Sequence, residues 1–239
     1  MKKRMFLTAV LGLLMVGLVS CNKNEEIPDD SDTDQNGLTS GQWVDMGLPS
    51  GLRWASYNLG ASKPEGYGDY YAWGDEIQHD VYDWNTYRWS TANSSGGLNE
   101  LTKYNTKALY GTVDNKQVIE SHDDAASVYW GDGARIPTKY EWDELLENST
   151  CQWTEINGVG GRKFTSRING NSIFFPAAGI RMDASRSSAG ESGRYWSSTL
   201  KSNDPTDAYH LYFGQYGFSI DEDCSYRCWG VSVRAVKEF

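Results

Sequence analysis

A mixed group of side chains near the end of the chain is well suited to contact another molecule. Residues 215–229 combine amide, carboxylate, hydroxyl, thiol, guanidinium and aromatic groups, which suit ligand contacts and suit a protein core poorly. Aromatic rings supply rigid contact area, while arginine and aspartate supply charged hydrogen bonds. The candidate ligand-binding residues are His210, Tyr212, Gln215, Tyr216, Asp221, Asp223, Ser225, Tyr226, Arg227 and Trp229.

Patterns that would predict catalysis or a bound metal are weak in this sequence. It contains no Gly-x-Ser-x-Gly nucleophile elbow, and residues 158–163 match neither the phosphate-loop nor the dinucleotide-binding pattern. Its three histidines, His79, His122 and His210, are too scattered along the chain to predict a metal cluster. We therefore expect no enzymatic activity, no metal and no other cofactor.

Two strand-like frames flank the mixed segment and would position it. Residues 195–199 with 208–213 form the first frame and residues 230–236 the second, because both are rich in aromatic and β-branched side chains that alternate with a period of two. Leu211 and Phe213 are expected to face the core, which turns His210 and Tyr212 outward. In the last frame Ser232 and Arg234 share one face, opposite Val231, Val233 and Ala235.

The rest of the domain reads as short strands with two short helices. Asp123 and Asp124 can cap a helix over residues 125–130, and Thr138 with Glu141 forms a capping box for a helix over residues 139–148. Strands are predicted at residues 41–46, 52–57, 69–73, 163–166 and 172–175, whereas residues 80–115 lack a clear period and read as an irregular insertion. The predicted class is α+β, with many short antiparallel strands.

The first forty residues predict export and anchoring. Residues 1–20 have a basic start and an apolar run, as in a signal peptide, and Cys21 follows as the residue expected to carry lipid. Residues 21–40 are acidic and read as a disordered tether, and residues 41–239 form the domain. The segment 23–26 resembles the acidic export signal of surface lipoproteins in some Gram-negative bacteria. We expect an outer-membrane lipoprotein exposed on the cell surface, touching the membrane only through Cys21.

Charge and cysteine content narrow the possible partners. The net charge is −10, and loss of Lys2, Lys3 and Arg4 with the signal peptide makes it −13, which argues against nucleic-acid binding. Four cysteines minus the lipidated one leave Cys151, Cys224 and Cys228, an odd number for an exported domain. A Cys224–Cys228 disulfide is a plausible prediction, and pairing with Cys151 is the alternative.

Six motifs in order resemble the Fibrobacter succinogenes major paralogous domain. They are VDMGLPSGLRW at 44–54, YAWGD at 71–75, RIPT at 135–138 with EW at 141–142, NSIFFPAAG at 171–179, YWSST at 195–199 and GVSVR at 230–234. That family is similar to the C-type-lectin-like fold, near the formylglycine-generating enzyme subclass. The resemblance covers residues 43–236 and implies a C-type-lectin-like fold. It carries little about function, because one fold hosts many functions.

Functions of related families are only partly matched. The triplets that calcium-dependent lectins use for sugar binding do not occur in the sequence. Formylglycine-generating enzymes use a cysteine pair near the C-terminus, but Cys224 and Cys228 differ from it in spacing and in distance from the last strand. The segment also resembles surfaces diversified by retroelements. The residues that fit such diversification are Asp207, His210, Tyr212, Gly214, Tyr216, Asp223, Cys224, Ser225, Tyr226, Arg227 and Cys228.

Together these features predict a surface-anchored, non-catalytic, ligand-binding lipoprotein of adhesin or receptor type. Its ligand, a glycan or a protein, would be held by the C-terminal loop and strand surface. One alternative is a variable protein that a retroelement diversifies at that surface. A less favoured alternative is a cysteine oxidase of the formylglycine-generating type.

Overall fold

A five-stranded sheet forms the centre of the computed structural model, which describes residues 42–91, 100–220 and 225–239. Its strand order is β11-β10-β9-β12-β3, antiparallel except between β12 and β9. These strands are β3 (Tyr70–Tyr71), β9 (Ser192–Leu200), β10 (Ala208–Gly214), β11 (Phe218–Ile220) and β12 (Val231–Ser232). The expected signal peptide, tether and lipidated Cys21 lie outside the described residues.

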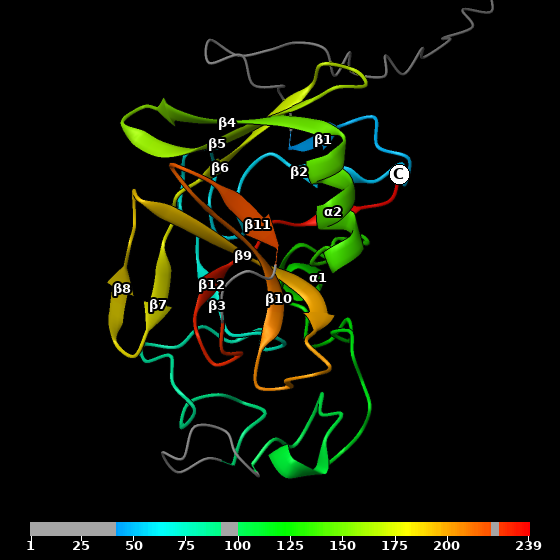
Figure 1. Cartoon of the computed structure of the whole chain (residues 1–239), viewed down its shortest axis with the longest axis vertical. Helices are drawn as coiled ribbons and strands as arrows, with labels where there is room; N and C mark the ends of the chain where they lie inside the picture. Colours follow the sequence, from blue (N-terminus) through cyan, green and yellow to red (C-terminus); the bar gives the residue numbers. More distant parts are fainter. Residues whose placement is uncertain (1–41, 92–99, 221–224) are drawn as a thin grey trace, which may run out of the picture.

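Smaller sheets surround the central one (Figure 1). One joins the two ends of the domain in the order β1-β2-β13, a second has the order β4-β5-β6, and β7 and β8 form a hairpin. Their bounds are β1 (Trp43–Asp45), β2 (Arg53–Ala55), β13 (Val236–Lys237), β4 (Ser149–Ile156), β5 (Val159–Ser166), β6 (Ser172–Pro176), β7 (Ile180–Met182) and β8 (Ser185–Ser187). The β4–β6 sheet lies at one end of the molecule, and the segment between β3 and α1 forms the other.

Both predicted helices are present, and local hydrogen bonds explain where they start. Helix α1 (Ala125–Trp130) begins after Asp124, whose carboxylate accepts a hydrogen bond from the Ser127 amide. Helix α2 (Lys139–Glu147) has the full capping box between Thr138 and Glu141. Among its described residues, the segment 72–124 holds only the short 3₁₀ helix η1 (Ala108–Tyr110) beyond its turns and bridges, which agrees with the irregular insertion predicted at residues 80–115. The predicted α+β class, with short antiparallel strands and two short helices, is confirmed.

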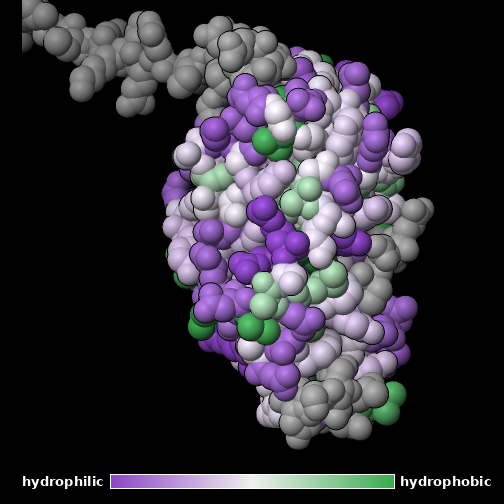
Figure 2. Space-filling model, turned by 90° about the vertical axis from the view of Figure 1, so that its left-hand side faces the viewer, coloured by the Kyte–Doolittle hydropathy of each residue, from purple (hydrophilic) through white to green (hydrophobic). Residues whose placement is uncertain are grey.

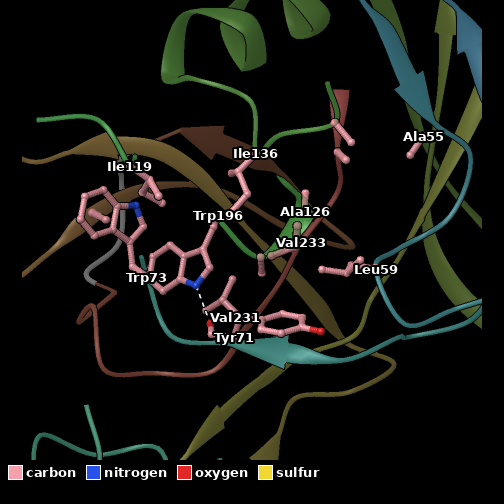
Figure 3. Packing of buried hydrophobic residues seen from close by; sticks show 14 of the residues in the cluster. Ala55, Leu59, Tyr71, Trp73, Ile119, Ala126, Ile136, Trp196, Val231 and Val233 are labelled. Carbon is pink, nitrogen blue, oxygen red and sulfur yellow. Dashed lines mark hydrogen bonds between the residues drawn. The ribbon is translucent and has the colours of Figure 1, made fainter. Parts of the chain in front are cut away.

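The central sheet separates two hydrophobic cores. Tyr195 and Trp196 are neighbours on β9, yet Tyr195 belongs to the core beneath β4–β6 and α2, and Trp196 to the core beneath α1. Trp196 donates from its indole nitrogen to the Tyr71 carbonyl at 2.7 Å, as Figure 3 shows. Because both faces of β9 and β10 are covered, the alternation along β10 is correct for Leu211 but does not turn His210 to solvent; both side chains are fully buried.

Sequence prediction missed four strands, β4, β7, β8 and β11, and the last of them changes the interpretation of the mixed segment. β4 follows α2 directly and pairs along its whole length with β5. β11 returns antiparallel along β10, so residues 214–220 form a hairpin instead of a long loop. The hairpin turn comes at residues 215–217, and Asp221, Asp223 and Cys224 beyond it lie outside the described residues.

We predict that Asp124→Asn makes the free energy of unfolding less dependent on pH. Burial raises the pKa of the Asp124 carboxyl from 3.8 to about 6, against hydrogen bonds from the Ile136, Ser127 and Ala126 amides that favour the ionised form. Because the folded pKa lies above the unfolded one, this group's contribution to stability is complete below about pH 4 and falls as pH rises to about 6, by about 3 kcal/mol.

Urea unfolding across that pH window measures the effect. As pH rises, the unfolding free energy of the native protein is expected to fall relative to that of the Asp124→Asn variant. Asp132→Asn is a control, because Lys237 lowers the pKa of that exposed carboxyl and the sign is opposite. Parallel curves for native protein and Asp124→Asn would contradict the assignment.

Candidate functional site

The candidate ligand-binding residues do not form one surface. Tyr212, Gln215 and Tyr216 lie at the β10–β11 hairpin, while Tyr226 pairs with Asp207 just before β10 begins. The length of β10 separates the two places by about 20 Å, at the rise per residue of an extended strand. Three other candidates lie in the interior.

The hairpin residues line an open groove on the surface of the described structure. It encloses about 710 Å³ between the β10–β11 hairpin, the β4–β5 hairpin and the turn before β9. Tyr216 is 97 % exposed, and Trp153 from β4 lines the same groove. The lining residues are Trp153, Ser188, Gly190, Glu191, Ser192, Tyr212, Gly214, Gln215, Tyr216, Gly217, Phe218 and Ser219.

Arg162 of β5 fixes the shape of this groove. Its guanidinium donates to the Gly214 carbonyl at 2.8 and 3.1 Å and to the Gln215 carbonyl at 3.3 Å. The same group stacks over the Phe218 ring at 5.2 Å. A buried side chain of one sheet thus holds the turn of another, so the groove is preformed and costs little ordering on binding.

The chemistry of the groove is that of a binding surface. Its lining offers aromatic rings, serine hydroxyls, one amide and the exposed carboxylate of Glu191. The described residues that line it include no histidine, cysteine or lysine. Such a mixture of rings and a few polar groups is typical of ligand recognition.

Arg227 is wrongly predicted as a ligand-contacting residue, because it is fully buried. Its guanidinium donates to the Tyr87 hydroxyl and to the Tyr104 and Pro205 carbonyls, each at 2.9 Å, and to the Lys103 carbonyl at 3.0 Å. It also lies 4.9 Å from the Trp73 ring centre. Three of these four acceptors come from the irregular insertion, whose path the sequence did not predict, and Pro205 lies between β9 and β10.

His210 and Ser225 are likewise interior residues. Both are fully buried, and the Ser225 hydroxyl lies 3.3 Å from His210 Nε2. The imidazole packs edge-on against Trp196 at 6.1 Å between ring centres. A serine beside a histidine resembles a catalytic pair, but burial keeps any substrate away from it. The pair therefore stabilises the interior, and neither residue forms part of a binding surface.

Tyr226 and Trp229 belong to a separate aromatic cluster with Trp84. Ring centres lie 5.0 Å apart for Tyr226 and Trp229 and 5.9 Å apart for Tyr226 and Trp84. Tyr226 is 39 % exposed, whereas Trp84 is buried. The cluster attaches the insertion to the segment before β12, and Tyr226 and the partly exposed Trp229 remain accessible in part.

The described cysteines are free thiols. Cys151 is partly buried and Cys228 buried, and neither is paired. This outcome excludes the alternative Cys151–Cys228 bridge, while Cys224, the other partner of the predicted Cys224–Cys228 disulfide, lies outside the described residues. Burial raises the pKa of the Cys228 thiol well above its usual range, which disfavours the reactive thiolate.

The structure brings together one group of possible metal ligands that the sequence did not predict. Ligand atoms of Glu120, His122 and Asp123 lie within 4.8 Å of one another. The Lys103 ammonium lies among them, 2.6 Å from Glu120 Oε2, 2.5 Å from Asp123 Oδ2 and 3.3 Å from His122 Nε2. The lysine thus occupies the place a metal ion would need, and the group is an ion-pair network.

Comparison with protein-family models, curated proteins and solved structures finds no match to this chain. Neither described helix has the length and apolar character that crossing a membrane requires. The function of this chain must therefore be inferred from the geometry of the groove and of the residues around it.

We predict that Arg227→Ala destabilises the protein by about 3 kcal/mol or more, since four acceptors lose their donor and a cavity is left in their place. Denaturant unfolding gives the value. Arg167→Ala is the matched control, because Arg167 is exposed and its loss is expected to change stability by at most about 0.5 kcal/mol. Equal, small effects of both changes would return Arg227 to the candidate binding surface.

Proposed function

We propose that this chain is a non-catalytic ligand-binding protein, anchored at a bacterial surface through lipid on Cys21. The observation that carries the proposal is the preformed groove, whose lining contains Tyr212, Gln215 and Tyr216 together with Trp153 of β4. Its ligand is a glycan or a protein segment, since exposed aromatic rings with a few polar groups bind either. The outer-membrane location rests on the N-terminal sequence.

We infer a C-type-lectin-like fold for the domain from the six motifs in order. Their placement in the structure supports a scaffold role. The first motif spans β1 and β2, the fourth includes β6, the fifth lies in β9 and the last includes β12. The tryptophans of these motifs, Trp54, Trp73, Trp142 and Trp196, are fully buried. Motifs of this kind define a framework on which an exposed groove is built.

The two rival functions receive less support from the site. An oxidase of the formylglycine-generating type needs an accessible, reactive cysteine, whereas Cys228 is 2 % exposed and its pKa is raised. A surface diversified by a retroelement needs positions that tolerate many residues. Arg227 and His210 are fully buried in specific contacts, which favours a fixed specificity.

We predict that Tyr216→Ala weakens binding by about tenfold or more and leaves the melting temperature unchanged. The ring is almost fully exposed, so its loss removes contact area for a ligand and hardly any internal packing. The measurement is binding of the purified chain to arrayed glycans and bacterial or host surface proteins. Tyr140→Ala is the matched control, because Tyr140 is 78 % exposed on α2, outside the groove. Full retention of binding by Tyr216→Ala would refute the groove as the site.

A second prediction tests the anchor. Cys21→Ser is expected to abolish incorporation of a fatty-acid label and to release the chain from the membrane fraction, because the sequence offers the thiol at this position as the lipid acceptor. Cys151→Ser, at a partly buried thiol within the domain, is the control and is expected to retain the label. Undiminished labelling of Cys21→Ser would refute the anchor without affecting the groove.

A further inference from the structure

Two arginines face each other across the β7–β8 hairpin. Arg181 and Arg186 are directly opposed in the antiparallel register, so their side chains leave the same face of the hairpin. Like charges in this arrangement repel and reduce stability. The two arginines are paired although the net charge is −10, so that basic side chains are fewer than acidic ones. An unfavourable contact held in place is a reason to look for a ligand that relieves it.

Neither arginine forms an ion pair with any described carboxylate; their neighbours are aromatic rings. The Arg181 guanidinium lies 5.7 Å from the Tyr82 ring centre, and that of Arg186 lies 5.3 Å from the Tyr67 ring centre. The Nε atom of Arg181 is buried and has no hydrogen-bond partner among the described atoms. Stacking on a ring leaves the terminal nitrogens of a guanidinium able to donate to an anion, and a hydrogen bond with the Tyr70 side chain uses part of this capacity in Arg186.

The backbone holds this pair rigidly. Arg181 exchanges two backbone hydrogen bonds with Gly230, at 2.8 and 2.9 Å, on the side opposite Arg186. Gly230 allows Tyr82 to pack against it, since a Cβ there would lie 2.9 Å from the ring. Tyr82 in turn bridges to Asp183 in the hairpin turn. The two guanidinium groups are therefore preorganised, which lowers the entropy lost on binding.

The arginine pair adjoins the groove. After β8 the chain continues through Ser188 and Gly190, which both line the groove. Tyr67, the ring beneath Arg186, places its hydroxyl 3.9 Å from the Cβ position of Gly190. Figure 2 shows the face of the molecule that carries this hairpin, and strongly hydrophilic side chains gather near its middle. One extended ligand can therefore contact both the rings of the groove and the arginines.

We propose that Arg181 and Arg186 form an anion-binding subsite that receives the carboxylate or sulfate groups of an acidic polysaccharide lying in the groove. The inference rests on the proposed function, since the groove supplies the sugar contacts. Guanidinium groups bind carboxylate and sulfate oxygens through paired, charge-assisted hydrogen bonds. The rings of Trp153, Tyr212 and Tyr216 favour a polysaccharide over an acidic protein segment, because they offer flat surfaces on which sugar rings stack.

The test compares matched polymers and variants of the full chain. Dextran sulfate and polygalacturonate are the anionic probes, dextran is the neutral probe, and polyglutamate represents an acidic protein segment. The chain carrying Arg181→Gln and Arg186→Gln is expected to bind dextran sulfate about tenfold or more weakly than the native chain, through lost charged hydrogen bonds. Binding by the native chain is expected to weaken as salt is raised.

Two controls make the result specific. Arg167→Gln with Lys116→Gln removes the same charge from exposed positions outside the hairpin and is expected to bind like the native chain. Arg186→Gln alone changes an exposed side chain, so it keeps the test valid if the double variant does not fold. General attraction to polyanions is not expected, because the chain itself is acidic.

Each outcome decides between the inference and the proposed function. Loss of anionic binding in the Arg181→Gln and Arg186→Gln variant, but not in the control variant with Arg167→Gln and Lys116→Gln, supports the subsite. Anionic binding that Tyr216→Ala removes and the arginine variant keeps supports the groove and overturns the subsite. A native chain that binds neither anionic polymer overturns the subsite and leaves the groove to be judged by neutral glycans and proteins. Polyglutamate binding as strong as that of dextran sulfate overturns the assignment to a polysaccharide.

Discussion

Arg227 and Arg234 are buried cations, and among the described residues neither forms an ion pair. A buried charge is costly unless hydrogen bonds replace its hydration. Arg234 donates to Asn58, to the Ala55 carbonyl and to the Phe174 carbonyl, and lies 4.3 Å from the Phe175 ring. Burial lowers its pKa to about 10, so it stays protonated at neutral pH. These acceptors belong to segments far apart in sequence, which must therefore keep their places around each guanidinium.

This constraint determines what the end of the chain can offer to a ligand. Arg227 holds the insertion through Lys103 and Tyr104, and Arg234 holds β2 and β6. The hydrogen-bonding groups of these two arginines are therefore engaged in the interior and do not contact a ligand. Among the described residues of this segment, Tyr216 and Tyr226 remain exposed, and Tyr216 lies at the hairpin tip where Arg162 fixes the turn at Gly214. The same arrangement of arginines thus keeps the interior rigid and leaves chemically varied side chains at the hairpin tips.

Local signals explain what the sequence could predict. The Thr138–Glu141 capping box lies within four residues, and the alternation along β10 correctly separates Leu211 from His210. The alternation does not reveal that the His210 face is also covered, because that depends on the second core across the sheet. The acceptors of Arg227 lie in residues without a readable period. The sequence predicted Tyr212, Gln215 and Tyr216 of the groove. It did not predict Trp153, because that residue lies on β4, a strand that escaped prediction.

Three strongly perturbed titratable groups lie outside the groove, in the framework of the domain. Active sites concentrate shifted pKa values in a cleft that substrate can reach. In this structure burial raises the pKa of Asp124 and of Cys228 and lowers that of Arg234, and all three are interior groups with framework contacts. The groove is instead lined by side chains whose value is shape, ring surface and hydrogen bonding. The unusual electrostatics of these three groups thus belong to the framework and not to the groove.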